Sequence, residues 1–317
     1  MSTPGEIRLA LIGCGEHAEV GHAIPLARYR AAYPREIELF AACDVWLDRA
    51  QKFCHKYEFT NAYSDFGEML SREKLDGCLA LVPPERISEV GVVLLRKRIP
   101  CLVEKPLAST SPELKALCSA ALSTGTANMV SVNRRFMPFL NRALHWARNA
   151  GRIRYVHCTL ARHARSEPDF IWATAVHAVD TLRYIGGDVA GFEWQTASPH
   201  ETSTPWYTIQ LHFKSGAEGH IDVLPTCGML EETYDLFGDG FRVSVTCPFG
   251  RKRGWVAHRD GTVVEEESTA DMPEDVLNGC YDETVAFIDA LRDGRALKPT
   301  IADVAPSVEI CMSIANR

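Results

Sequence analysis

Five short apolar runs in the first 132 residues constrain the fold of this 317-residue chain more than any other feature. Each run is apolar throughout, as in strands that are buried on both faces, and helix-patterned stretches separate the runs. This alternation predicts βαβ units in a doubly wound parallel sheet. The runs cover residues 7–13, 37–43, 77–82, 100–104 and 128–132.

The pattern changes from about residue 152, where apolar and polar residues alternate. Val156, Cys158 and Leu160, for example, share one face of a strand whose other face is polar, which is typical of an antiparallel sheet packed on one side. Two long helices, predicted over residues 168–186 and 274–294, bracket this sheet. We therefore predict an α/β Rossmann domain over residues 1–132. An α+β domain with a large, mostly antiparallel, open-faced sheet is predicted over residues 133–317.

Composition and charge narrow the function. The chain is 46% hydrophobic and 24% charged, with a formal net charge of −7 and no long Lys/Arg run, so it lacks the electrostatic footprint of a nucleic-acid binder. It shows neither a signal-peptide pattern nor an apolar stretch of roughly 18 residues. Its eleven cysteines have no zinc or redox spacing and are predicted to be reduced. These features predict cytoplasmic small-molecule chemistry without a metal, a nucleic acid or a membrane.

A glycine turn follows the first predicted strand and has the form G-x-G-x-x-A, from Gly13 to Ala18. Such a turn lets the backbone approach a pyrophosphate at the start of a helix. Asp44 ends the second strand, where a carboxylate accepts hydrogen bonds from a ribose 2′-hydroxyl and repels a 2′-phosphate, which favours NAD over NADP. A plain glycine turn and a solvated Asp are the alternatives. We interpret His17 and His22 as ordinary first-turn residues.

A charged pair, Glu104-Lys105, ends the strand at 100–104 and precedes Pro106. Ligands of doubly wound sheets bind at the carboxyl ends of the strands. A lysine there can polarise a hydroxyl oxygen and take part in proton transfer. The alternative is a surface ion pair.

Together with "VNRRFMP" (132–138) and "GRI" (151–153), these motifs resemble the Gfo/Idh/MocA (glucose–fructose oxidoreductase, inositol dehydrogenase, rhizopine catabolism) family. The resemblance spans nearly the whole chain. It implies an NAD(P)-dependent oxidoreductase that moves a hydride between nicotinamide and a carbinol carbon of a sugar, polyol or sugar-acid derivative. It also implies a homo-oligomer, dimer or tetramer, formed through the open sheet face. The implied cofactor-binding residues are Gly13, Cys14, Gly15, Ala18, Asp44, Pro83, Glu104 and Lys105.

The resemblance also implies a catalytic segment of the form D-x-G-x-H-x-x-D, which here begins at Ala173. It implies that Lys105 holds and polarises the reacting oxygen, that His177 exchanges its proton, and that Asp180 orients His177. The leading Asp of the motif has become Ala173, a loss that can cost on the order of 10²-fold in rate. Ser88 stands where relatives often have a histidine, which predicts altered contacts near the nicotinamide.

Several polar residues of the second domain have open roles. Arginine forks suit carboxylates, so an acidic sugar derivative is one hypothesis and solvated surface arginines are the other. The residues in question are Asn133, Arg134, Arg135, Arg162 and His163. The polar strand faces also carry His157, His212, His220 and Asp222, which we interpret as an open face or oligomer interface and not as a metal cluster.

Two other functions fit the same motifs. One is a hydrolase or lyase that oxidises a sugar transiently with tightly held NAD. The other is a non-catalytic nucleotide or sugar sensor, which Ala173 and Ser88 favour.

Overall fold

The computed structural model describes residues 5–197, 204–268 and 272–316, which fall into two compact units. The first unit comprises residues 1–132 and 280–306, and the second comprises residues 133–279 and 307–317. We predicted a boundary at 132/133 but kept residues 280–306 in the second domain. In the structure that segment packs into the first unit. No helix in the described part of the chain is long and apolar enough to cross a membrane.

The first unit is built on a six-stranded, fully parallel sheet with the order β3-β2-β1-β4-β5-β6. All five predicted apolar runs form strands. The edge strand β3 was not predicted, because it has three half-buried residues and no apolar run. The strands are β1 (Ile7–Ile12), β2 (Ile37–Cys43), β3 (Asn61–Tyr63), β4 (Gly77–Ala80), β5 (Cys101–Glu104) and β6 (Asn128–Ser131).

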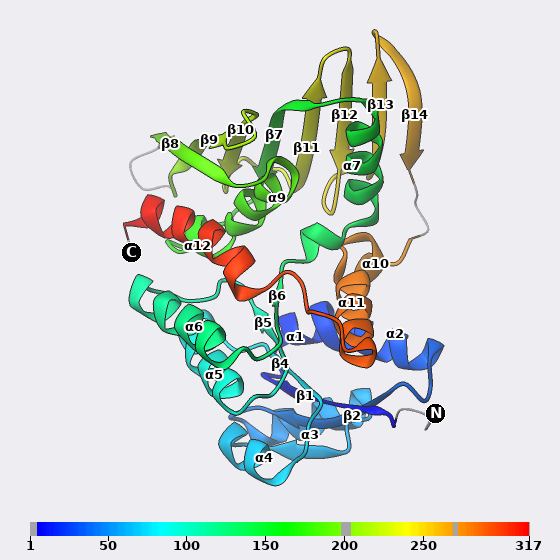
Figure 1. The fold of residues 1–317 in the computed structure, drawn as a ribbon, viewed down its shortest axis with the longest axis vertical. Helices are drawn as coiled ribbons and strands as arrows, with labels where there is room; N and C mark the ends of the chain where they lie inside the picture. The colour runs from blue at the N-terminus through cyan, green and yellow to red at the C-terminus, as the bar shows by residue number, and fades with distance from the viewer. Residues whose placement is uncertain (1–4, 198–203, 269–271, 317) are drawn as a thin grey trace. The chain divides into compact units, whose positions relative to one another are not determined.

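Helices cover both faces of this sheet, with α5 and α6 on one side and α2 and α11 on the other (Figure 1). They are α1 (Glu16–Ala18), η1 (Glu19–Ala23), α2 (Ile24–Ala32), α3 (Leu47–Tyr57), α4 (Phe66–Arg72), α5 (Pro84–Arg96), α6 (Ser111–Thr124) and α11 (Cys280–Asp293). The segment α1-η1-α2 is helical without a break, and η1 is a π-helical turn. Phe287 and Ile288 of α11 are fully buried, and the Val130 amide donates to the Pro299 carbonyl at 2.8 Å. These contacts explain why residues 280–306 belong to this unit.

The second unit is built on an eight-stranded sheet with the order β14-β13-β12-β11-β7-β10-β9-β8. Only the β7/β10 pair is parallel, so the prediction of a mostly antiparallel sheet is confirmed. In β10 and β11 every second residue is buried and the residues between are half-exposed. The strands are β7 (Ile153–Ala161), β8 (Val189–Ala197), β9 (Trp206–Phe213), β10 (Glu218–Leu224), β11 (Glu231–Gly238), β12 (Phe241–Thr246), β13 (Gly254–Arg259) and β14 (Thr262–Ser268).

The buried face of this sheet packs against α7 and α9 (Figure 1). The helical segments are η2 (Asn133–Phe136), α7 (Pro138–Ala150), α8 (Phe170–Ala173), α9 (Val176–Gly186) and α10 (Glu274–Leu277), while α12 (Ile301–Ala315) straddles the unit border. Both long helices predicted from the sequence are interrupted. The first breaks between α8 and α9, where 3₁₀-type bonds run from the His177 and Ala178 amides to the Thr174 and Ala175 carbonyls.

The second break lies at Gly279, between α10 and α11. Gly279 has a φ of +86°, and a Cβ there would lie 2.2 Å from the carbonyl oxygen of Asn133. Only glycine tolerates both conditions. The turn therefore ends the predicted helix and directs the chain out of the second unit.

The eleven cysteines all lie in the described residues and form no disulfide, and nine of them are buried. Burial raises the pKa of buried thiols such as Cys101 and Cys247 to about 12, so these thiols stay protonated and unreactive.

Candidate functional site

The predicted glycine turn follows β1 as a tight bend closed by backbone bonds. The Gly13 amide donates to the Cys43 carbonyl at 2.7 Å. Gly13 has a φ of +98°, and a Cβ on it would lie 2.4 Å from the carbonyl oxygen of Leu81. The positive φ and the nearby Leu81 carbonyl therefore require glycine at position 13, whether or not a ligand is bound.

Gly15 has a different environment. It is the N-cap of α1, in extended conformation, and no side chain caps the helix at this end. A Cβ on Gly15 would meet no protein atom within 4 Å. A ligand can therefore approach the backbone closely at Gly15, at the start of a helix, as a pyrophosphate needs to do.

Asp44 lies where β2 ends and holds the turn by its carboxylate. Its Oδ2 accepts from the Cys14 amide at 2.9 Å and its Oδ1 accepts from the Trp46 amide at 2.9 Å. The guanidinium of Arg49 approaches Oδ2 at 3.5 Å. Asp44 is buried, yet each oxygen keeps a second lone pair for a ligand hydroxyl.

A cavity of about 410 Å³ opens beside Asp44. Its lining includes the ends of β1 and β2 and the residues after β4, so it lies where the strand order reverses between β1 and β4. Ligands of doubly wound sheets bind at this point. Gly13, Asp44 and Pro83 of the predicted cofactor set line the cavity. The glycine turn, the Asp44 carboxylate and this cavity together fit the adenosine and pyrophosphate parts of a dinucleotide.

Glu104 ends β5 as a buried carboxylate held from two directions. The His17 Nε2 bonds Glu104 Oε1 at 2.7 Å, and the His22 Nε2 lies 3.4 Å from the same oxygen. Glu104 Oε2 accepts the backbone amide of Lys105 at 2.6 Å. The helix of the glycine turn is thereby tied to the start of the Glu-Lys-Pro segment.

Neighbouring side chains keep the Glu104 carboxyl ionised. Burial alone would raise the pKa of the Glu104 carboxyl, but His17, His22 and Lys105 hold that pKa well below its usual range. Burial lowers the pKa of His22 in spite of its contact with Glu104, so the His22 ring is neutral. An ionised carboxylate only accepts hydrogen bonds, so the Nε2 atoms of both rings carry the proton.

The interpretation of His17 and His22 as ordinary first-turn residues missed this contact. The two residues are five apart, a spacing that does not bring side chains together on a regular α-helix. The π-helical turn η1 widens the helix and brings the ring centroids to 6.1 Å. A sequence pattern tuned to helical spacings of three and four cannot detect such a pair.

His177 lies in the first turn of α9 and is buried, and Ala173 ends α8 one turn before it. Asp180, which is predicted to orient His177, has other hydrogen-bond partners in the structure. Both Asp180 oxygens accept from Arg135 at 2.8 Å, and Oδ1 also accepts from Ser307 at 2.8 Å. Asp180 therefore fixes Arg135 and Ser307.

Arg134 and Arg162 both form ion pairs with the carboxylate of Glu232. Arg134 donates to both Glu232 oxygens at 3.0 and 3.1 Å, and Arg162 donates to Oε2 at 2.7 Å. Tyr234 adds a hydrogen bond to Oε1 at 2.6 Å. Burial alone would raise the pKa of Glu232, but the two arginines overcome it and lower this pKa to about 2.

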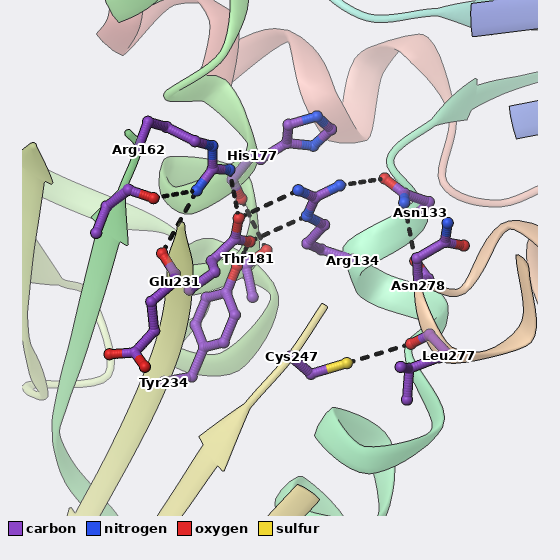
Figure 2. A network of polar contacts seen from close by, with 12 residues as sticks. Asn133, Arg134, Arg162, His177, Thr181, Glu231, Tyr234, Cys247, Leu277 and Asn278 are labelled. Atoms are coloured by element: carbon purple, nitrogen blue, oxygen red, sulfur yellow. Dashed lines mark hydrogen bonds and ion pairs between the residues drawn. The ribbon is translucent and has the colours of Figure 1, made fainter. Parts of the chain in front are cut away.

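This network revises the hypothesis that Arg134 and Arg162 recognise an acidic substrate. Both are buried and their charge is shared with Glu232. Asn133 is also engaged, since its amide donates to the Asn278 carbonyl at 2.8 Å (Figure 2). Of the five residues proposed for substrate binding, His163 is the exposed one.

Ser88 and the polar sheet face complete the set of predicted positions. Ser88 is buried and donates to the Glu113 carbonyl at 2.9 Å, which ties α5 to α6.

On the eight-stranded sheet, His157, His220 and Asp222 come together, whereas His212 pairs with Glu218 at 2.7 Å. A separate hollow of about 810 Å³, between α7 and the β13–β14 hairpin, contains none of the predicted site residues.

Comparison with known proteins agrees with this geometry. Residues 7–133 match a family described as an oxidoreductase family with an NAD-binding Rossmann fold. The chain is 25% identical over 315 residues to 4-carboxy-2-hydroxymuconate-6-semialdehyde dehydrogenase of a Sphingobium species, covering 94% of each protein. It is 26% identical over 232 residues to D-apiose dehydrogenase of Paraburkholderia graminis, covering 67% of this chain and 59% of that protein.

Solved structures show the same fold over nearly the full length. A dehydrogenase from Chromobacterium violaceum superposes with a TM-score of 0.83 at 18% identity, covering 99% of this chain and 95% of the other. An oxidoreductase from Agrobacterium radiobacter, in complex with NAD⁺, L-tartaric acid and magnesium, gives a TM-score of 0.79 at 17% identity, with 96% and 94% covered. At these identities the likeness concerns the fold.

Proposed function

We propose that this chain is a dehydrogenase of sugars, polyols or sugar-acid derivatives in the Gfo/Idh/MocA family of NAD-binding oxidoreductases, whose family model matches residues 7–133. The observation that carries the proposal is the arrangement at one edge of the parallel sheet. The glycine turn, the Asp44 cavity and Lys105 all follow the carboxyl ends of strands in the first unit. The names of both relatives are those of dehydrogenases.

The bound nicotinamide would supply or accept the hydride at its C4 position. In the oxidative direction the substrate carbinol loses a hydride from carbon and a proton from oxygen, which leaves a carbonyl. We assign the hold on the reacting oxygen to Lys105, whose backbone is fixed by Glu104. We assign the proton transfer to His177, because imidazole exchanges protons near neutral pH.

The decisive test replaces Lys105. Purified protein is titrated with NADH and then screened against sugars, cyclitols, sugar acids and carboxylated semialdehydes, the last suggested by the name of a relative. We expect Lys105→Ala to bind NADH while its turnover falls by about 10²-fold or more. Lys74→Ala, at an exposed position, serves as control. Unchanged turnover in Lys105→Ala would refute the assignment.

We further propose a preference for NAD over NADP, which Asp44 supports because its carboxylate lies beside the cavity. Arg49 is close enough to offset part of that charge. We expect NADH to bind at least about tenfold more tightly than NADPH, and Asp44→Ser to reduce this ratio. Equal affinities would contradict the preference.

The sensor hypothesis keeps one specific observation in its favour, the methyl side chain of Ala173 one turn before His177. It predicts NADH binding without turnover on any compound of the screen. The Ala173→Asp variant separates the two functions, since only a catalytic site gains rate from a restored carboxylate. A hydrolase or lyase is recognised in the same screen by substrate consumption without net NADH formation.

We also propose a homo-oligomer formed through the half-exposed face of the eight-stranded sheet, in a reducing cytoplasm. The half-exposed residues that alternate along β10 and β11 support the first point, and eleven cysteines without a disulfide support the second. Light scattering coupled to size exclusion tests the oligomer. A monomer at micromolar concentration would contradict it.

A further inference from the structure

Three side chains on the half-exposed face of the eight-stranded sheet converge as metal ligands do. His157 Nε2 lies 2.8 Å from Asp222 Oδ2, and His220 Nε2 lies 3.2 Å from Asp222 Oδ1. One ligand atom from each residue fits within a span of 4.8 Å. We name these three residues the sheet-face cluster.

The backbone holds this cluster rigidly. β7 and β10 are paired in parallel, and His157 lies directly opposite His220. Their intervening neighbours, Cys158 and Ile221, are fully buried on the other face. A shift of one residue would move every side chain to the wrong face, so the register is fixed. The ligands therefore project from two locked strands in the centre of the sheet.

We propose that the sheet-face cluster binds a divalent transition-metal ion of the zinc type. Two imidazole nitrogens and one carboxylate oxygen are a ligand set that Zn²⁺ accepts, with water in the fourth position. In the single chain the three side chains are 26–32% exposed, which leaves room for an ion and its water. A cavity of about 210 Å³, lined in part by His220, adjoins the cluster.

The charges around the cluster favour a cation. The two oxygens of the Asp222 carboxyl each face one of the two imidazoles. Asp235 lies opposite His157 on β11 and adds a second carboxylate. Arg242 is bound to Asp235 at 2.8 Å and offsets part of that charge. The Asp222 carboxyl thus lies beside two imidazoles, with a second carboxyl on the neighbouring strand.

A second histidine-carboxylate group, His17, His22 and Glu104, fits this role less well. Both of its imidazoles approach the same carboxylate oxygen, and the other oxygen holds the Lys105 amide. His22 is fully buried, so an ion would have to shed its water. This group serves as the anchor of the Glu-Lys-Pro segment and provides the competing site that an experiment must exclude.

Zinc retention by the full-length chain tests the proposal. Protein freed of metal with a chelator is equilibrated with Zn²⁺, and bound zinc is measured by mass spectrometry and calorimetry. We expect one zinc per chain from the cluster. Asp222→Asn should weaken binding by more than the 10- to 100-fold that loss of a supporting residue costs. His212→Gln, on the same sheet face but outside the cluster, is the matched control and should bind as the wild type does.

Two additional variants make every outcome decisive. His157→Gln repeats the test if Asp222→Asn loses its thermal transition, and a Co²⁺ spectrum without thiolate bands excludes the cysteines. His17→Gln should leave zinc binding unchanged. The proposal is wrong if zinc does not bind, if folded Asp222→Asn or His157→Gln binds like wild type, or if His17→Gln abolishes binding.

Discussion

At the scale of single residues, Gly13 and Gly15 are constrained by different partners. Gly13 is required by the protein itself, since its φ is positive and the Leu81 carbonyl leaves no room for a Cβ. Gly15 has ordinary backbone angles and open space around its Cα, so only a ligand can make a side chain there costly.

Two alanine variants separate these causes. We expect Gly13→Ala to lower the free energy of unfolding by on the order of 1–3 kcal/mol, because of backbone strain and the clash. We expect Gly15→Ala to change stability by less than about 0.5 kcal/mol. It should nevertheless weaken NADH binding by roughly tenfold, equivalent to about 1.4 kcal/mol. Thermal unfolding and fluorescence titration measure the two effects.

If Gly15→Ala binds NADH as tightly as the wild type, the pyrophosphate does not lie against this turn. Gly125→Ala supplies a control for positive φ away from the cradle, since its φ is +61° and its Cβ position is empty. Gly125→Ala should lose stability but bind NADH as tightly as the wild type.

Sequence motifs predicted much of the candidate site in the first unit. Gly13, Asp44 and Glu104 lie at strand ends as predicted from the motifs and the apolar runs that precede them. His17 and His22 were missed because their meeting depends on a π-helical turn, which inserts a residue into a helix without changing its apolar pattern. Backbone irregularities of this kind have no composition signal.

At the scale of elements, Asp180 shows how a helix can be fixed by a residue that resembles a catalytic one. It anchors α9 to η2 through Arg135 and to α12 through Ser307. Its spacing from His177 predicted an interaction between these two, since three residues span one helical turn. The sequence could not show that Arg135, which is only partly exposed, binds the same carboxylate.

We expect Asp180→Asn to lower the free energy of unfolding by about 3 kcal/mol, because it removes the charge that balances Arg135 in a pair whose carboxylate is buried. The exposed Asp188→Asn, which breaks a surface pair with Lys214, should cost less than about 0.5 kcal/mol. Urea unfolding measures both. If Asp180→Asn keeps its stability but shifts the pH profile of turnover, Asp180 acts on His177 after all.

The network around Glu232 links β7, β11 and η2 and predicts a response to acid. The folded-state pKa of Glu232, about 2, lies below its ordinary value of 4.5. Its stabilising contribution is therefore complete above about pH 4.5 and is lost as the pH falls toward 2. The difference corresponds to on the order of 3 kcal/mol.

We expect Glu232→Gln to be less stable than wild type at pH 7, with the gap narrowing as the pH falls below about 4.5. Urea unfolding between pH 7 and 3.5 measures the gap. Glu218→Gln, at a half-exposed strand position, should follow the wild-type curve. A gap that does not change with pH would mean that Glu232 is not ionised in the folded protein.

At the scale of the whole molecule, sequence patterns predicted both sheets but not the path of the chain between the units. Buried parallel strands and half-buried antiparallel strands differ in their periodicity, which is a local signal. The return of residues 280–306 to the first unit depends on contacts between segments far apart in the sequence. The predicted single helix over 274–294 masked the turn at Gly279, where the chain passes from one unit to the other.

The returning segment completes the core of the first unit. Phe287 and Ile288 of α11 are 1% and 0% exposed, and Asn128 of β6 accepts the Ile301 amide at 2.8 Å. Ser131 of β6 donates to Glu283 at 2.8 Å. Removing a buried phenylalanine side chain alone costs roughly 3–5 kcal/mol, against a total stability of about 5–15 kcal/mol.

We therefore expect a fragment of residues 1–132 to lack a cooperative thermal transition and to bind NADH weakly. The same fragment joined to residues 280–306 by a flexible Gly/Ser linker should unfold cooperatively and regain binding, because α11 and the Pro299 bond to β6 restore the covered sheet. A joined fragment carrying Phe287→Ala should fall between the two. If residues 1–132 alone unfold cooperatively and bind NADH as tightly as the joined fragment, the returning segment is packed on a core that is already complete.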